Sequence, residues 1–196
     1  MNGRVRLAAA LACLTIAHPA QAHDVIAGVG GFYGGLLHPL LVPTHLLALV
    51  GLGLFIGQQP QHRIALAVFF VIGLAAGLLA IALAVGETPA SDVLLIATGI
   101  AGVLVVVATP PPRIISSLLL AASGASLGLD SAPNEVLIRL AVFSLFGTAL
   151  GATILLTSVM AGVTHLRGEW QLIGLRIVGS WIAASAILVL ALRFAR

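Results

Sequence analysis

The sequence predicts an all-α membrane protein with about six transmembrane helices behind a cleavable signal peptide, the first helix being broken at a His-Pro bend. Of its 196 residues, 60% are hydrophobic and 8% are charged, whereas soluble domains carry about 25% charged residues. Long apolar runs alternate with short polar connections. A soluble fold of this size could not bury so many apolar side chains, so a lipid bilayer is the predicted surrounding of the outer helix faces.

The charged residues are few and lie at the edges of the apolar runs. All nine basic residues are arginines, and the formal net charge is +3. Arginines in this pattern are typical of membrane boundaries, so they do not indicate binding of nucleic acid. The one cysteine, Cys13, falls in the predicted export signal. A mature chain without it has no thiolate to offer a soft metal ion.

The N-terminal segment has the three parts of a signal peptide. Arg4 and Arg6 form the positive start, residues 7–17 form the apolar core, and residues 20–22 (Ala-Gln-Ala) form the cleavage site. We therefore expect a signal peptide over residues 1–22. The alternative is an uncleaved anchor helix, which leaves the following residues on the same side of the membrane.

Cleavage leaves a single polytopic membrane domain, residues 23–196, that begins with a histidine. The terminal amine and the imidazole of His23 can chelate a divalent metal ion, and Asp24 can add an oxygen. The alternative is that His23 is a solvent-exposed remnant of the signal. The connections between apolar runs are too short to hold a soluble domain.

The first apolar segment, residues 25–57, is rich in glycine and is interrupted by Pro39 and Pro43. Proline removes a backbone donor and clashes with the preceding helical turn, so a straight helix is not expected. We predict a bend near residues 38–43, followed by a regular helix over residues 44–55. Irregular backbone at membrane depth is tolerated only where protein or a wet cavity covers it.

Five further apolar runs follow the broken segment. They cover residues 64–85, 93–108, 114–129, 137–163 and 175–192. The run at 114–129 is shorter than the usual span of about 20 residues. The longest run contains Gly147 and Gly151 in a G-x-x-x-G pattern, which predicts close contact with another helix.

The arginines also predict an orientation. Connections that contain Arg63, Arg113 and Arg167 alternate with connections whose charged residues are all acidic, namely Glu87, Asp92, Asp130 and Glu135. Basic loops favour the cytoplasm, so His23 is expected outside. Together with the signal peptide, this pattern predicts a multi-pass protein of the bacterial inner membrane, with its mature N-terminus outside.

His38 and His45 lie in or beside the broken segment. Ionisable residues at membrane depth are costly and usually face the protein interior or a transport pathway. The bend predicted between them lets the two imidazoles converge, and imidazole suits divalent ions such as nickel, cobalt, zinc or copper. The alternative is that each ring bonds to a backbone carbonyl that a proline leaves without its donor.

The run His-Pro-Leu-Leu-Val-Pro-Thr-His at residues 38–45 resembles the H-P-x-x-G-x-D-H signature of the HupE/UreJ family of hydrogenase and urease accessory membrane proteins. The glycine-rich lead-in at residues 31–35 and the segment from Arg176 onward also resemble that family. The resemblance implies a nickel or cobalt permease, in which the two histidines and the signature aspartate help to bind the ion.

The chain departs from the family pattern at three places. Val42 stands at the glycine position of the signature, and Thr44 stands at its aspartate position. A second family motif, rich in histidine, corresponds to residues 122–128, where the glycines persist and the histidines do not. The candidate metal ligands are therefore His38 and His45, with Thr44 and His23 as further candidates.

The resemblance predicts a secondary transporter of a divalent transition-metal cation, nickel or cobalt. Two alternatives stay open, a membrane accessory or scaffold protein that has lost the full metal site and a carrier of another small solute. The sequence lacks GxSxG, H-E-x-x-H and P-loop motifs, so we expect no enzymatic activity and no cofactor. The expected partners are the lipid bilayer and the metal ion, and a homo-oligomer or accessory partner is left open.

The first testable prediction is that the mature protein begins at His23. Intact-mass measurement of membrane-extracted protein should give the mass of residues 23–196, because the A-x-A site directly follows the apolar core. A mass that includes Met1 would contradict cleavage and would leave the predicted helices unaffected.

Overall fold

The computed structural model describes residues 31–83, 88–133 and 137–195, and these ranges contain seven helices and no strand. The helices are α2 (Gly31–Leu41), α3 (Pro43–Gly57), α4 (Arg63–Ala82), α5 (Ala90–Val107), α6 (Arg113–Leu129), α7 (Ile138–Thr164) and α8 (Glu169–Phe194). The all-α prediction is confirmed for this part of the chain. The predicted signal peptide and His23 lie outside the described residues.

Helices α2 and α3 are the two halves of the broken first segment and meet at an angle of 69°. Val42 separates them in an extended conformation, with φ −88° and ψ 111°. Pro43 is the first residue of α3, a position where proline is favoured because the backbone donor it lacks has no partner within the helix. The break falls inside residues 38–43, so the predicted bend is confirmed.

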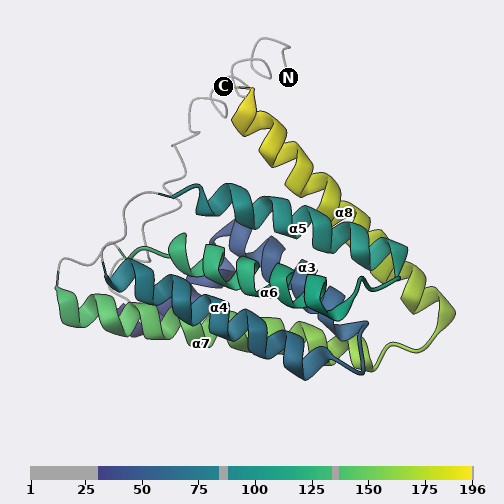
Figure 1. Cartoon of the computed structure of the whole chain (residues 1–196), viewed down its shortest axis with the longest axis horizontal. Coiled ribbons are helices and arrows are strands. Elements are labelled where there is room, and N and C mark those ends of the chain that lie inside the picture. Colours follow the sequence, from purple (N-terminus) through teal and green to yellow (C-terminus); the bar gives the residue numbers. More distant parts are fainter. Residues whose placement is uncertain (1–30, 84–87, 134–136, 196) are drawn as a thin grey trace, which may run out of the picture.

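Helix α3 occupies the centre of the molecule, and the other helices surround it as three closely packed pairs. The pairs are α2 with α7, α4 with α6, and α5 with α8. Figure 1 shows α3 between α5 and α8 on one side and α4 and α7 on the other. Every residue from Gly51 to Gly57 of α3 is buried. The outer helices therefore separate the second half of α3 from the surrounding solvent or lipid.

The outer helices have the length and composition of membrane spans. Helices α4, α5, α7 and α8 each meet this description, and the bent pair α2–α3 makes a fifth span if it is counted as one. Large apolar side chains such as Ile114, Ile138 and Trp181 are more than 70% exposed, which suits faces that contact lipid. The chain is thus a multi-pass membrane protein.

The structure accounts for four or five of the about six predicted membrane spans. Helix α6 is apolar but has 17 residues, shorter than the other candidates. It packs closely along α4. Its crossing of the membrane stays a prediction.

Helix α8 begins six residues before the predicted apolar run at residue 175. Its first turn is polar, so hydropathy alone does not include it. The side-chain oxygen of Gln171 accepts hydrogen bonds from the backbone N–H groups of Arg167 (3.0 Å) and Gly168 (2.8 Å). These contacts satisfy donors at the helix start and extend α8 beyond its apolar part.

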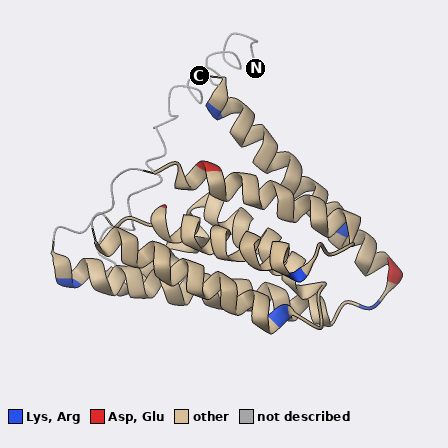
Figure 2. Ribbon diagram, viewed as in Figure 1, with Lys and Arg blue, Asp and Glu red and all other residues tan. Residues whose placement is uncertain are grey.

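The charged residues are distributed as expected for a membrane protein. Figure 2 shows that the charged residues of the described ranges lie near the ends of the helices and not in the middle of the bundle. One ion pair joins two helix ends, because Arg193 of α8 donates to Asp92 of α5 at 2.7 Å. Since both side chains are partly exposed, this pair contributes little stability, about 0–1 kcal/mol.

Glycine allows the close approach of α7 to α2. A Cβ atom on Gly147 would lie 2.8 Å from the backbone nitrogen of Leu36 and still closer to the carbonyl oxygen of Phe32. Gly151 likewise faces the backbone of Leu36. The predicted contact of the G-x-x-x-G pair with another helix is therefore confirmed.

We predict that Gly147→Leu strongly lowers the yield of folded protein. Its side chain would collide with backbone atoms, which cannot move aside as a flexible side chain can, and overpacking of this kind costs about 1–3 kcal/mol or more. Gly162 on the same helix is the matched control, because a Cβ there meets nothing within 4 Å. Monodisperse yield by size-exclusion chromatography measures both variants, and equal losses would contradict the packing argument.

Candidate metal site

His38 and His45 lie on either side of the bend between α2 and α3. On an unbroken helix, seven residues would separate them by about 10 Å along the axis. In the structure their ring centroids are 5.1 Å apart, with an angle of 67° between the ring planes. The bend therefore brings the two imidazoles together, as the sequence predicted. Their role as metal ligands stays a prediction.

His45 is fully buried in the first turn of α3, and its ring contacts a carboxylate from another helix. The Nε2 atom lies 2.9 Å from Oδ2 of Asp130, which is 85 positions further along the chain. The Asp130 side chain is 28% exposed and that of His45 is 0% exposed. An ionised carboxylate can only accept a hydrogen bond, so Nε2 of His45 donates it.

Asp130 is the candidate site residue that the sequence did not reveal. The sequence places it in an acidic connection that is expected to lie outside. In the structure Asp130 directly follows Leu129 as the C-terminal cap of α6, and its backbone nitrogen donates to the carbonyl of Ser126 at 2.9 Å. No local sequence pattern predicts a contact between residues so far apart in the chain. The one sequence feature that points to Asp130 is its position directly after an apolar run.

The second ring nitrogen of His45, Nδ1, bears on whether the ring can bind a metal ion. Its Nδ1 atom is buried and has no hydrogen-bond partner among the described residues. With the proton on Nε2, Nδ1 carries a lone pair that can be offered to a cation. A histidine whose other nitrogen donates to a carboxylate is the usual arrangement of a metal-binding imidazole, since the carboxylate fixes the ring and raises its basicity.

The contact with Asp130 also bears on the alternative reading of the histidines. The sequence allowed each ring to bond to a carbonyl that a proline leaves without a donor. For His45 the hydrogen-bond partner is instead a side chain on α6. The carbonyl of His38 accepts from the backbone nitrogen of Val42 at 3.0 Å, which closes the last turn of α2.

The structure adds less about the other two predicted ligands, Thr44 and His23. Thr44 is half-buried beside His45, and its hydroxyl makes no hydrogen bond to any described residue. His23 lies outside the described ranges. Within residues 31–83, 88–133 and 137–195, no group of three or more histidine, cysteine or acidic side chains is close enough to hold a metal ion. The site consists of two pairs, His38 with His45 and His45 with Asp130.

Comparisons with known proteins identify the family. No curated protein and no solved structure matches the chain. One family model, described as "HupE / UreJ protein", matches residues 11–189 and so covers most of the sequence. The chain belongs to the HupE/UreJ family.

Proposed function

We propose that this protein is a secondary transporter of a divalent transition-metal cation, with nickel or cobalt as the metal. The family is associated with nickel or cobalt transport or with an accessory role. The observation that supports transport in this chain is the buried imidazole of His45, which meets His38 across the bend and Asp130 from α6. Ionisable groups enclosed in a membrane bundle are usually parts of an ion pathway.

Asp130 has a specific part in this proposal. A divalent cation loses much hydration free energy when it enters a low-dielectric site, and a negative charge offsets this cost. Thr44 brings no charge to the signature position. Asp130 supplies the missing carboxylate from α6, either through His45 or by turning its oxygens to the ion. Water and backbone carbonyls near Pro39 and Pro43 complete the coordination.

The incomplete ligand set also supports function as a pathway. A permeating ion must leave its site as well as enter it, so transport needs weaker binding than storage does. Two imidazoles and one partly exposed carboxylate give such a site. The same incompleteness favours the second candidate, an accessory protein that keeps the fold without transport, since no group of three ligands is preformed in the described ranges.

The proposed orientation places the metal site near the outer face. His45 lies at the start of α3 and Asp130 at the end of α6, whereas Arg63 and Arg113 begin α4 and α6 at the opposite end. Basic residues favour the cytoplasm, so that opposite end faces inward in a bacterial inner membrane. The mature N-terminus then lies outside.

We predict that His38→Ala, His45→Ala and Asp130→Asn each reduce nickel or cobalt accumulation in cells. Loss of a ligand, or of the carboxylate that orients it, lowers metal affinity about 10–100-fold. Thr44→Asp should strengthen binding, because it restores a carboxylate next to His45. Metal content of washed cells measures accumulation, and titration of the purified protein measures affinity.

His165→Ala is the matched control, because His165 is exposed at the end of α7. It should accumulate metal like the wild type. If the wild type accumulates no more metal than cells with an empty vector, and Thr44→Asp adds nothing, the accessory function is correct instead. Equal expression of all variants has to be shown by immunoblot.

A further prediction concerns orientation. Gln61 and Ala132 are both exposed, and they lie in connections at opposite ends of the bundle. In intact cells an impermeant thiol reagent should label Ala132→Cys and not Gln61→Cys, while both should react after the membrane is opened. Native Cys13 is removed with the predicted signal. Labelling of Gln61→Cys alone would reverse the orientation.

A further inference from the structure

A second polar feature lies at the other end of α3. Gly57 and Gln58, at the end of that helix, line a cavity of about 450 Å³ together with residues from α4, the α7–α8 connection and α8. The twelve positions from His45 to Gly57 separate this cavity from the metal site by about 18 Å along the helix. The two features therefore require separate explanations.

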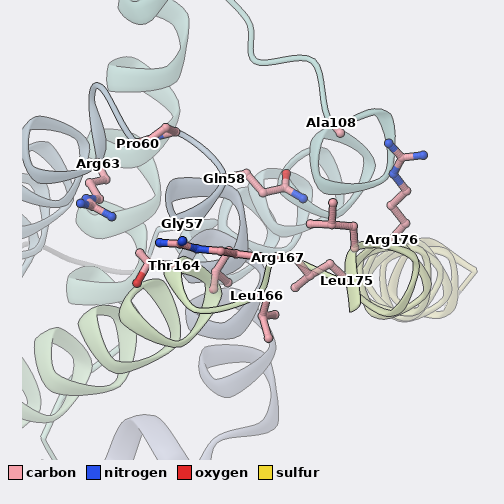
Figure 3. A pocket seen from close by; sticks show the side chains of 12 residues that line it. Gly57, Gln58, Pro60, Arg63, Ala108, Thr164, Leu166, Arg167, Leu175 and Arg176 are labelled. Atoms are coloured by element: carbon pink, nitrogen blue, oxygen red, sulfur yellow. The ribbon is translucent and has the colours of Figure 1, made fainter. Parts of the chain in front are cut away.

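Three arginines line this cavity, namely Arg63, Arg167 and Arg176. Figure 3 shows Arg63 and Arg176 on opposite sides, with Arg167 reaching across the end of α3 between them. Each guanidinium has five N–H donors and keeps its charge at any physiological pH. The cavity thus concentrates three permanent positive charges and up to fifteen donors.

No acidic side chain lines the cavity. The ion pairs of the described residues involve Asp130 and Asp92, which contact other groups. Glu169, the acid nearest in the sequence, is exposed and pairs with none of the three arginines. None of the three guanidinium groups donates a hydrogen bond to another described residue. Their charge therefore has no counterpart in the described part of the protein.

Two neutral polar side chains at the cavity are held in place by hydrogen bonds to backbone carbonyls. The amide nitrogen of Gln58 donates to the carbonyl of Val105 at 3.3 Å, which ties α3 to α5. The hydroxyl of Thr164 donates to the carbonyl of Ala161 at 2.7 Å. A structural alternative is that the arginines only balance the negative ends of α3, α5 and α7. The three guanidinium groups donate no hydrogen bond to the carbonyls of those helix ends in the described residues, which argues against charge balance as the only role of the arginines.

We infer that this cavity binds a phosphate group, carried either by an anionic phospholipid headgroup or by free inorganic phosphate. Arginine is the side chain best matched to phosphate oxygens, because its planar donors bind two of them at once. The lipid is the expected source, since the cavity lies where the apolar helices end. Trp170, 77% exposed at the start of α8, is the kind of residue that marks this boundary.

The test uses the full-length protein in detergent. Native mass spectrometry compares retention of phosphatidylglycerol with that of zwitterionic phosphatidylcholine, in the wild type and in Arg63→Gln and Arg167→Gln. Each lost arginine should lower affinity for phosphatidylglycerol about fivefold. Arg139→Gln is the control, because Arg139 lies in the first turn of α7, away from the cavity.

A second arm identifies the source of the phosphate. If neither lipid is preferred, millimolar inorganic phosphate should raise the thermal stability of the wild type and leave that of Arg167→Gln unchanged, which would assign free phosphate. The inference is overturned if lipid retention is equal for both headgroups and phosphate has no effect, or if Arg139→Gln is as damaging as Arg167→Gln. The wild-type comparison decides the matter even if a variant fails to fold.

Discussion

The structure depends on the way that one broken apolar segment is enclosed. Pro39 and Pro43 lack the backbone donor of a helical residue, and a break in backbone hydrogen bonding is tolerated at membrane depth only where protein or a wet cavity covers it. The molecule encloses the second half of α3 in its centre, where Gly51 to Gly57 are all buried, while Leu40, Leu41 and Pro43 beside the break are exposed. The enclosure also keeps the imidazole of His45 away from lipid. Fold and candidate site therefore follow from the same constraint.

Enclosure of a central helix requires outer helices that approach one another closely. In α4 and α6 this is achieved by glycines on both sides, because a Cβ on Gly124 would lie 2.8 Å from the backbone nitrogen of Leu74, and Gly77 faces α6 in the same way. Packing of this kind relies on dispersion and on small residues, since lipid provides no hydrophobic drive between helices. The remnant glycines of the second family motif thus have a structural role even though its histidines are absent.

The parts of the structure that sequence could predict are local. The bend follows from two prolines within five residues, the convergence of His38 and His45 follows from the bend, and the contact at Gly147 follows from a four-residue spacing. The polar start of α8 lies before the predicted apolar run at residues 175–192, because the side chain of Gln171 caps the helix there and hydropathy does not report on caps. The contact of Asp130 with His45 was missed, since it depends on how α6 docks against α3 and no local spacing encodes that.

The origin of the carboxylate changes how the site can work. In the family signature the acid precedes the second histidine by one residue, so both move with the same helix. Here Thr44 holds that position, and under the proposal the charge comes from Asp130 at the C-terminal end of α6, which packs mainly on α4. If the cation binds at Nδ1 of His45, with Asp130 acting through the ring or turning its oxygens to the ion as proposed, its affinity depends on the position of the α4–α6 pair relative to α3. Cation binding must then favour the arrangement in which Asp130 is close, and movement of the pair away from α3 must weaken the hold on the ion. Under this proposal, such a displacement would release the ion without the breaking of any helix.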